Sequence, residues 1–335
     1  MFREMKILLA AIVIMVIASS CGQSGPPEPS TSPPESTQAA KSSQKAQIRY
    51  GGLRLIDDVP VHVALQEGFF LQENLEVEVI DFNSALERNT ALQAGRVDTG
   101  IYDILQPIFL NREGEVVKIV RAVMRPTEVR AQFPIVAGAK SGITTVEGLK
   151  NKKIAVGKNT VTVYVTHAIL LANGFAPREI STIDIPNIAL RLQMATEGQV
   201  DAVTLPEPLA SLAVAQGGKV VVDDRGGKVI GQVSSLPFSQ AMIKENPDAV
   251  RRFLKAYEKA VEAFNSNPEK YRELMNRVGR VPEALQKSIQ LPVFLKSGVP
   301  TNEEILAVGK WLTQQGVITE PLPYSSVVSS EYLPK

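Results

Sequence analysis

The sequence predicts an α/β protein whose folded body has two lobes of similar build. Strand-like and helix-like segments alternate from residue 47 to about residue 224, and such alternation is typical of parallel sheets with helices on their faces. Part of this pattern occurs twice along the chain. After a low-complexity N-terminal segment, about 290 of the 335 residues remain, which is enough for a large core and two lobes.

The repetition is visible at the level of single residues. Residues 80–98 align without a gap with residues 183–201, at a shift of 103 positions, and share Ile, Asp, Arg, Gly, Val and Asp at matching places. A shift of 106 positions aligns Ile48, Gly51, Gly68 and Phe69 with Ile154, Gly157, Gly174 and Phe175. Any two strand–helix units share some of these residues, so similar βαβαβ build is better supported than common ancestry.

The elements follow in a regular order. In the first half we expect strands at 47–55, 75–82 and 97–103, with helices at 60–73 and 84–94. In the second half we expect strands at 152–157, 181–186, 200–205 and 219–224, with helices at 161–173, 188–197 and 208–216. The C-terminal third is mostly helical, with amphipathic helices at 248–266 and 302–316. We predict that they pack on lobe one, with Trp311 in the core.

The N-terminus carries the marks of an export signal. A short charged start is followed by the apolar run 7–18, which is too short to span a bilayer, and then by small residues directly before Cys21. Small-small-Cys after such a run resembles the lipobox of bacterial lipoproteins, although Ala18 stands where the lipobox usually has Leu. An ordinary signal peptide with an incidental cysteine is the alternative. We predict a lipoprotein signal peptide at 1–20 and lipidation of Cys21.

Cys21 is the only cysteine of the sequence, which excludes internal disulfides, cysteine-based metal sites and a cysteine nucleophile. Residues 22–45 are rich in Pro, Ser, Gln and Glu and lack apolar periodicity. Such a composition cannot bury enough surface to fold, and its prolines favour an extended spacer. We therefore predict that the lipidated cysteine and a disordered tether occupy 21–45.

Several motifs in order carry a family resemblance: "LIDDVPVHVALQEGFFLQENLEVEVIDF", "ALQAGRVDTGIYD", "EGQVDAVTLPEPLA", "FSQAMIKENPDAVRRFLKAYEKAVEAFNSNPEKY" and "VGKWLTQQGVI". Together they resemble the solute-binding proteins of ABC importers, in the nitrate/sulfonate/taurine and thiamine-pyrimidine-precursor branch. The resemblance covers roughly residues 48–333. It implies a type II periplasmic-binding-protein fold: two α/β lobes, a ligand cleft between them and two crossover segments, expected near 132–136 and 234–241.

The resemblance also implies domain limits and a function. We expect lobe one at 46–134, lobe two at 135–236, and a return to lobe one with C-terminal helices at 237–335. The protein would be anchored to the outer face of a bacterial cell membrane by the lipid. There it would capture a small solute by hinge closure, as a monomer, and deliver it to an ABC permease and its ATPase.

Candidate ligand-binding residues follow the predicted strands, because open α/β sheets bind ligands outside the carboxyl ends of their strands. Helix N-termini at this edge also present free N–H groups. In lobe one the candidates are Asp57, Asp58, Asn83, Ser84, Tyr102 and Asp103. In lobe two they are Lys158, Asn159, Thr160, Thr162, Tyr164, Asn187 and Glu207.

The same residue types also cap helices, so each candidate has a structural alternative. One of Asp57 and Asp58 is expected to be only a helix cap, and Tyr102 could simply pack under a helix. Arg88 and Arg191 occupy matching places in the two lobes, which favours a structural role for both. In the resembled family the loop that holds Lys158 contacts the ligand, so this loop is the first candidate among those that follow the strands.

The ligand class stays open at this stage. Lys158 with Thr and Asn donors suits an anion such as a sulfonate or nitrate. Asp57, Asp103 and Glu207, together with the tyrosines, suit a heterocycle bearing amino groups, such as a thiamine pyrimidine precursor. Several carboxylates around one small cleft would repel a free anion, which favours the heterocycle slightly.

Other functions are less consistent with the sequence. The formal charge is +1 and no basic stripe occurs, which argues against nucleic-acid binding. The two histidines, His62 and His167, lie on predicted helices, and no catalytic triad, metal-ligand spacing or phosphate loop is present. We therefore predict no enzyme, no cofactor and no metal. A non-transport sensing lipoprotein and a pyrimidine-synthesis-type enzyme on the same fold are the alternatives.

Overall fold

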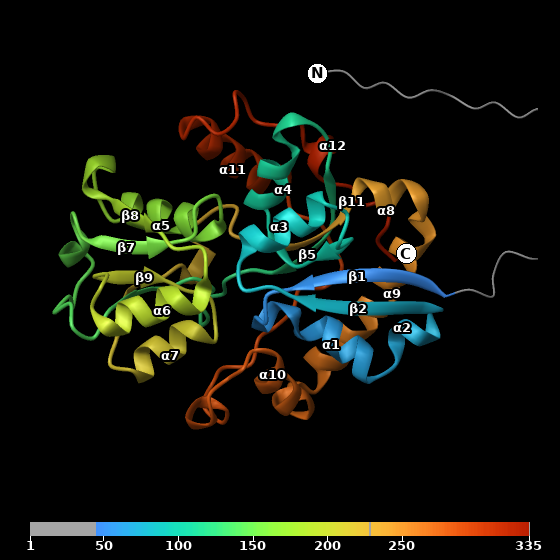
Figure 1. The fold of residues 1–335 in the computed structure, drawn as a ribbon, viewed down its shortest axis with the longest axis horizontal. Helices are drawn as coiled ribbons and strands as arrows, with labels where there is room; N and C mark the ends of the chain where they lie inside the picture. Colours follow the sequence, from blue (N-terminus) through green and yellow to red (C-terminus); the bar gives the residue numbers. More distant parts are fainter. Residues whose placement is uncertain (1–44, 228, 335) are drawn as a thin grey trace, which may run out of the picture. The chain divides into compact units, whose positions relative to one another are not determined.

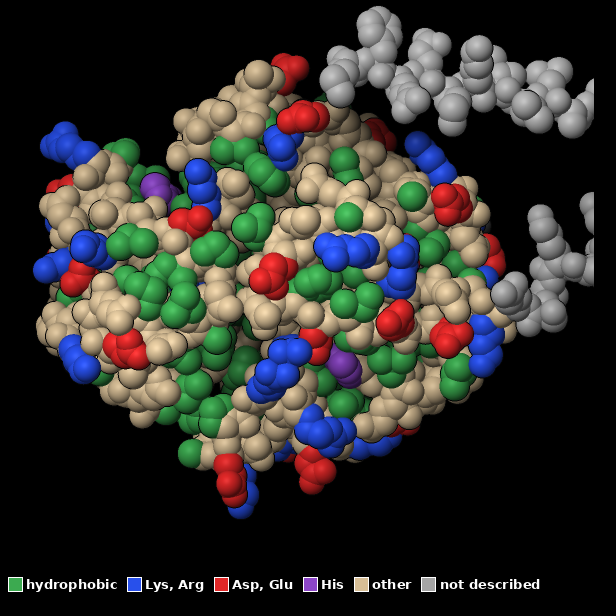
Figure 2. Space-filling view, viewed as in Figure 1, with side chains coloured by type: hydrophobic (Ala, Val, Ile, Leu, Met, Phe, Trp, Pro, Cys, Tyr) green, Lys and Arg blue, Asp and Glu red, His purple; other side chains and the backbone are tan. Residues whose placement is uncertain are grey.

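The computed structural model describes residues 45–227 and 229–334. The predicted signal peptide, Cys21 and nearly all of the predicted tether lie outside these residues. Within them, no helix combines the length and the apolar character needed to cross a bilayer. Lys and Arg alternate with Asp and Glu over the face seen in Figure 2, so neither sign of charge forms a large patch there.

The first sheet has six strands in the order β2-β1-β3-β11-β4, with β5 paired to β11. Strands β1 (Ala46–Gly52) and β2 (Leu75–Asp81) run parallel with residue 46 opposite residue 75, and β3 (Thr99–Gly100) runs parallel to β1. Strand β11 (Ser234–Ser239) runs antiparallel to β3, to β4 (Tyr102–Asp103) and to β5 (Val117–Met124). The sheet is therefore mixed rather than parallel.

The second sheet has five strands in the order β10-β6-β9-β7-β8. Strands β7 (Lys153–Val156), β8 (Ser181–Asp184) and β9 (Ala202–Thr204) form its parallel part. Strands β6 (Ile135–Ala137) and β10 (Lys219–Val222) add an antiparallel edge. Helices α5 (Val161–Ala172), α6 (Ile188–Glu197) and α7 (Leu209–Ala215) accompany this sheet, with α5 on one face and α6 and α7 on the other (Figure 1).

Two elements of the first sheet's lobe differ from the expected ones: one helix is divided at a glycine, and one strand is interrupted. The helix expected at 60–73 is two helices, α1 (Val59–Gln66) and α2 (Phe69–Gln72), because Gly68 between them has a left-handed φ of 71°. The strand expected at 97–103 is interrupted at Ile101 into β3 and β4. Helices α3 (Ala85–Gln93) and α4 (Leu105–Leu110) follow β2 and β4.

The C-terminal third returns to the first sheet. Helices α8 (Gln240–Glu245), α9 (Pro247–Ser266) and α10 (Arg272–Val278) follow β11, and α9 buries its apolar stripe in the same core as α1 and α2. Helices α11 (Asn302–Gln314) and α12 (Tyr324–Val327) complete the chain. Trp311 of α11 is half-buried, and it packs edge-on against Tyr164 and His167 of α5. Helix α11 thus contacts the second lobe as well as the first.

The chain passes between the sheets twice, through residues 125–134 and 223–233. The two passages are tied together, because the Asp224 carboxylate accepts the backbone N–H groups of Gln132 and Phe133 at 3.0 Å each. At Gly231 in the second passage φ is 82°, and an added Cβ would lie 2.7 Å from Val308 of α11. The precise lobe limits given above, 46–134, 135–236 and 237–335, stay predictions.

Candidate functional site

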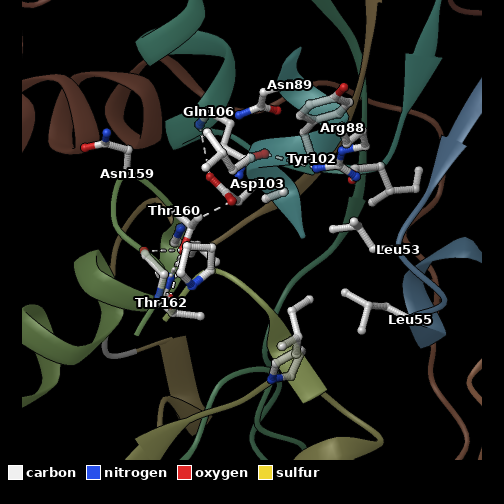
Figure 3. A pocket seen from close by; sticks show the side chains of 18 of the residues that line it. Leu53, Leu55, Arg88, Asn89, Tyr102, Asp103, Gln106, Asn159, Thr160 and Thr162 are labelled. Atoms are coloured by element: carbon white, nitrogen blue, oxygen red, sulfur yellow. Dashed lines mark hydrogen bonds between the residues drawn. The ribbon is translucent and has the colours of Figure 1, made fainter. Parts of the chain in front are cut away.

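A cavity of about 250 Å³ lies where the carboxyl ends of the strands of both sheets meet. Figure 3 shows residues from both lobes around it: Leu53 and Leu55 after β1, Tyr102 and Asp103 of β4, and Asn159, Thr160 and Thr162 after β7. This is the edge at which open α/β sheets bind ligands. The site is therefore a cleft, with each lobe supplying one wall.

Most of the residues proposed from the sequence line this cavity: Asp57, Asp58, Tyr102, Asp103, Lys158, Asn159, Thr160 and Thr162. The others lie elsewhere. Ser84 accepts the N–H of Glu87 at 3.1 Å and Asn187 accepts that of Leu190 at 3.0 Å, so both act as helix caps. The backbone carbonyl of Asn83 accepts the Ile188 N–H at 3.5 Å, which is a contact between the lobes.

Tyr164 and Glu207 also lie outside the wall of this cavity. The Tyr164 hydroxyl donates to the Ile230 carbonyl at 2.5 Å, and burial raises its pKa to about 12. Glu207 accepts the N–H of Ser211 in the first turn of α7 at 3.2 Å, although the N-cap residue of this helix is Pro208, and Glu207 lines a different cavity.

The two aspartates after β1 have different tasks. Asp58 is buried and accepts the Tyr50 hydroxyl at 2.5 Å and the backbone N–H groups of Leu53 and Leu55 at 3.1 and 3.2 Å. It therefore holds the loop that follows the strand. Asp57 accepts a hydrogen bond from the hydroxyl of Ser234 on β11, and burial raises the pKa of Asp57.

Asp103 connects the two lobes directly. Its carboxylate accepts the backbone N–H of Gln106 at 3.0 Å and, across the cleft, that of Val161 at the start of α5 at 3.2 Å. Burial raises the pKa of Asp103 to about 6, against these bonds and the attraction of Arg88, which lower it. The Asp103 carboxyl therefore changes between its protonated and ionised forms near pH 6.

The loop after β7 is held by its own threonines. The Thr160 hydroxyl donates to the Gly157 carbonyl at 2.7 Å, and Thr162 accepts the Gly157 N–H at 2.9 Å. The backbone N–H of Lys158 donates to Asp184 at 2.7 Å. The loop is thereby fixed before any solute arrives, which is the condition for low-cost recognition.

Two buried arginines line the cleft, although the sequence argument assigned them a structural role. Arg88 is 2% exposed, donates to the Ile101 carbonyl and to Gln106 at 3.0 Å, and stacks 3.6 Å from the Tyr102 ring centre. Arg191 is 3% exposed and donates to the Thr204 carbonyl at 3.2 Å. Burial lowers the pKa of Arg191 to about 10. Both arginines brace strand ends and contribute to the wall.

The remaining wall is largely apolar. Its apolar side chains are Leu53, Leu55, Ala85, Leu86, Ile101, Phe109, Phe133, Val161, Pro186, Ile188 and Pro206. Among the residues that the structure describes, no cluster of His, Cys, Asp and Glu could hold a metal ion. The site combines a few fixed polar groups with apolar surface, as small-molecule pockets do.

Comparison with known proteins decides the family. The model of the family described as "NMT1/THI5 like" matches residues 56–271, which is more than half of the chain. The chain belongs to this NMT1/THI5-like family. Its relatives include the riboflavin-binding protein RibY of Chloroflexus aurantiacus, which is 20% identical over 99% of this chain and 98% of RibY.

Solved structures agree on the fold. The alkanesulfonate-binding protein SsuA of Xanthomonas axonopodis pv. citri, bound to MOPS, superimposes with a TM-score of 0.73 at 20% identity, over 86% of this chain and 99% of that one. The nitrate-binding protein NrtA of Synechocystis PCC 6803 does so with a TM-score of 0.65 at 16% identity, over 87% of each chain. The fold is that of a two-lobed periplasmic binding protein, and these relatives are solute-binding proteins.

Proposed function

We propose that the chain is the solute-binding component of an ABC importer and captures a small organic solute between its lobes. One observation carries this: a single cavity has walls from the strand ends of both sheets, so a bound solute would contact both lobes at once. A permease with its ATPase is the partner that this role requires. Because the relatives are binding proteins, we assign the chain no enzymatic role.

The mechanism is a shift from open to closed lobes. A solute that contacts both walls stabilises the closed arrangement by its differential affinity for it. The bond from Val161 to Asp103 and the contact between Ile188 and Asn83 join the lobes across the cleft. Opening breaks both contacts, whereas the passages tied by Asp224 stay together. These passages are therefore the natural hinge.

The solute best suited to the cleft is a planar, uncharged heterocycle with N–H groups. Apolar side chains dominate the wall, and most charged groups in it already have protein partners. Asp103 has capacity for a further donor, since its carboxyl can accept an N–H in addition to its two backbone bonds. RibY, named for binding riboflavin, makes riboflavin the first heterocycle to test.

An anionic solute is the second candidate, for one specific reason. Arg88 and Arg191 line the cleft from opposite lobes, and neither forms an ion pair with a carboxylate in the part of the chain that the structure describes. SsuA and NrtA, named for alkanesulfonate and nitrate binding, lend this candidate support. Four carboxylates in the same wall, those of Asp57, Asp58, Asp103 and Asp184, oppose it.

We also propose that the protein is exported, and that lipid on Cys21 anchors it as a monomer to the outer face of a bacterial cell membrane. Two acyl chains suffice for stable anchoring, whereas one is marginal. The anchor would keep the binding domain near its permease. Labelling of cells with a radioactive fatty acid should mark the wild-type protein and leave Cys21→Ser unlabelled.

A thermal-shift screen tests the binding role. The mature chain carrying Cys21→Ser would be heated with pyrimidines, thiamine, riboflavin, sulfonates, nitrate and bicarbonate. A true ligand at about 100 times its dissociation constant adds about 2.7 kcal/mol to the free energy of unfolding, which is a clear rise in melting temperature. A heterocycle as the hit supports the first candidate and an anion supports the second. No rise with any member of the panel would count against both solute classes.

A further inference from the structure

A second cavity, of about 220 Å³, lies beside the first. Its walls come from the first passage between the sheets, from the start of α7, and from the C-terminal arm between α10 and α11. The lining residues are Arg130, Ala131, Glu207, Ser211, Leu285, Ser288, Ile289 and Gln290. Leu285 and Ile289 belong to the core of lobe one, whereas α7 packs on the second sheet. Both lobes and the hinge therefore shape this cavity.

Two segments of the chain contribute residues to both cavities. Phe133 lines the first cavity and Ala131 the second, two residues apart in the same passage. Pro206 lines the first and Glu207, the next residue, lines the second. A solute that occupies both cavities would have to pass these two segments.

Arg130 is the unusual group in the second cavity. Its side chain is more than nine-tenths buried, with 8% exposed. A guanidinium carries five N–H donors, yet the only acceptor that the described residues offer it is the Met124 sulfur, 3.0 Å from Nη1. Sulfur is a weak acceptor, and no described carboxylate lies within ion-pair distance of Arg130. The remaining N–H groups of Arg130 keep some accessible surface, so a solute in the cavity can reach them.

The charges around Arg130 restrict what that partner can be. Asp57, Glu207 and Asp224 lie close enough to raise its pKa, while burial lowers it more strongly. A free anion would meet these carboxylates, and a free cation would meet the guanidinium. The other polar wall residues, Ser211, Ser288 and Gln290, can each donate and accept. The surroundings thus favour uncharged oxygens, such as hydroxyl groups.

We propose that this second cavity is a subsite of the cleft that binds the hydroxyl-rich, uncharged chain of an elongated solute whose planar ring occupies the first cavity. Arg130 donates to the hydroxyl oxygens, and Ser288 and Gln290 complete the contacts from the C-terminal arm. The subsite determines specificity by length and by hydroxyl content. This inference rests on the proposed binding of a planar heterocycle in the first cavity.

Riboflavin and lumiflavin test the subsite, because they share one ring system and only riboflavin carries a hydroxylated chain. Calorimetric titration of the mature Cys21→Ser protein would give both dissociation constants. We expect riboflavin to bind roughly tenfold tighter, the gain from one or two hydrogen bonds. Arg130→Ala should abolish this gain, so that the two dissociation constants measured on the same variant become about equal. Arg178→Ala, an exposed arginine outside both cavities, is the matched control and should keep the gain.

A second variant protects the test if Arg130→Ala does not fold. Ser288 is exposed at the rim of the cavity, so Ser288→Trp would fill the space and leave Arg130 in place. It too should remove the preference for riboflavin. Equal affinity of the wild type for both flavins, or a preference that survives both variants, would overturn the subsite and leave the proposed function standing. If neither flavin binds, the planar-ring solute fails, and the subsite proposal fails with it.

Discussion

Replacing Asp103 by Asn tests how burial controls the charge at the junction of the lobes. Burial raises the pKa of Asp103 from its ordinary 3.8 to about 6. The folded state then binds a proton more tightly than the unfolded chain does, so Asp103 costs stability as the pH rises from about 4 to above 6. Each pH unit between the two pKa values corresponds to about 1.4 kcal/mol, and two units give about 3 kcal/mol. Because the side chain keeps some exposure to the cleft, we expect about 2 kcal/mol.

Asn cannot ionise, so Asp103→Asn should escape this loss. The variant also has a cost that does not depend on pH, because its amide NH2 faces either the Gln106 or the Val161 N–H, both of which donate to the carboxylate. The measured quantity is therefore the difference in free energy of unfolding between variant and wild type, from urea titrations at pH 4 and pH 8. From pH 4 to pH 8 this difference in free energy of unfolding should change by about 2 kcal/mol in favour of the variant.

Asp248→Asn is the matched control, because Asp248 is an exposed carboxylate in the first turn of α9. It accounts for the general effect of losing one negative charge. If the difference for Asp103→Asn does not change with pH, or moves in favour of the wild type, then burial does not hold the pKa of Asp103 near 6. The assignment of Asp103 as a group that exchanges protons near neutral pH would then be wrong.

Three further predictions concern the hinge, the core and the anchor. Gly231→Ala should lower the free energy of unfolding, measured in urea, by about 2 kcal/mol or more, since the left-handed backbone and a valine of α11 at 2.7 Å leave no room for a Cβ. The control Gly174→Ala, at a glycine with φ of 83° and open space around it, should lower it less. Equal losses in the two variants would contradict the role of packing at Gly231. Arg121→Met should lower the free energy of unfolding by about 3 kcal/mol, because the fully buried guanidinium pairs with Glu258 at 2.7 Å. The double variant with Glu258→Leu should lose less stability than the sum of the two single variants, and strict additivity would show that the pair is not coupled. Cys21→Ser should move the protein from the membrane fraction to the soluble fraction, and retention in the membrane would refute lipid anchoring.

The fold was accessible from the sequence because its signals are local. Alternating strand and helix patterns and the 103-residue repeat indicate two α/β lobes, and the structure and the family confirm this architecture. The antiparallel strand β11 was not predicted as part of the first sheet. Its pairing with β5 joins residues more than 100 positions apart, and no local pattern specifies such a contact.

The candidate site was accessible only in part, for two physical reasons. Asn, Ser, Thr and Asp at a strand end serve equally well as helix caps and as ligand contacts, so residue type could not separate Ser84 and Asn187 from Thr160, which caps α5 and also lines the cleft. Long side chains reach the cleft from within helices, as Arg88 does from α3. The second cavity depends on residues 285–290, which have no regular pattern. Packing and hydrogen bonds from Arg272 and Asn276 to the carbonyls of this segment hold it in place, and no local pattern specifies those contacts.

The central claim is that the lobes close on a solute, and a distance measurement between them tests it most directly. The Cys21→Ser protein contains no cysteine, so spin labels can be attached only at Thr90→Cys on α3 and Gln193→Cys on α6. Both positions are exposed and occupy matching places in the two lobes. Pulsed electron–electron double resonance would measure the distance between the two spin labels, with and without each solute that raises the melting temperature of the protein. If the lobes close on the solute, the distance distribution should be shorter and narrower in its presence. An unchanged distribution under saturating solute would contradict capture by closure.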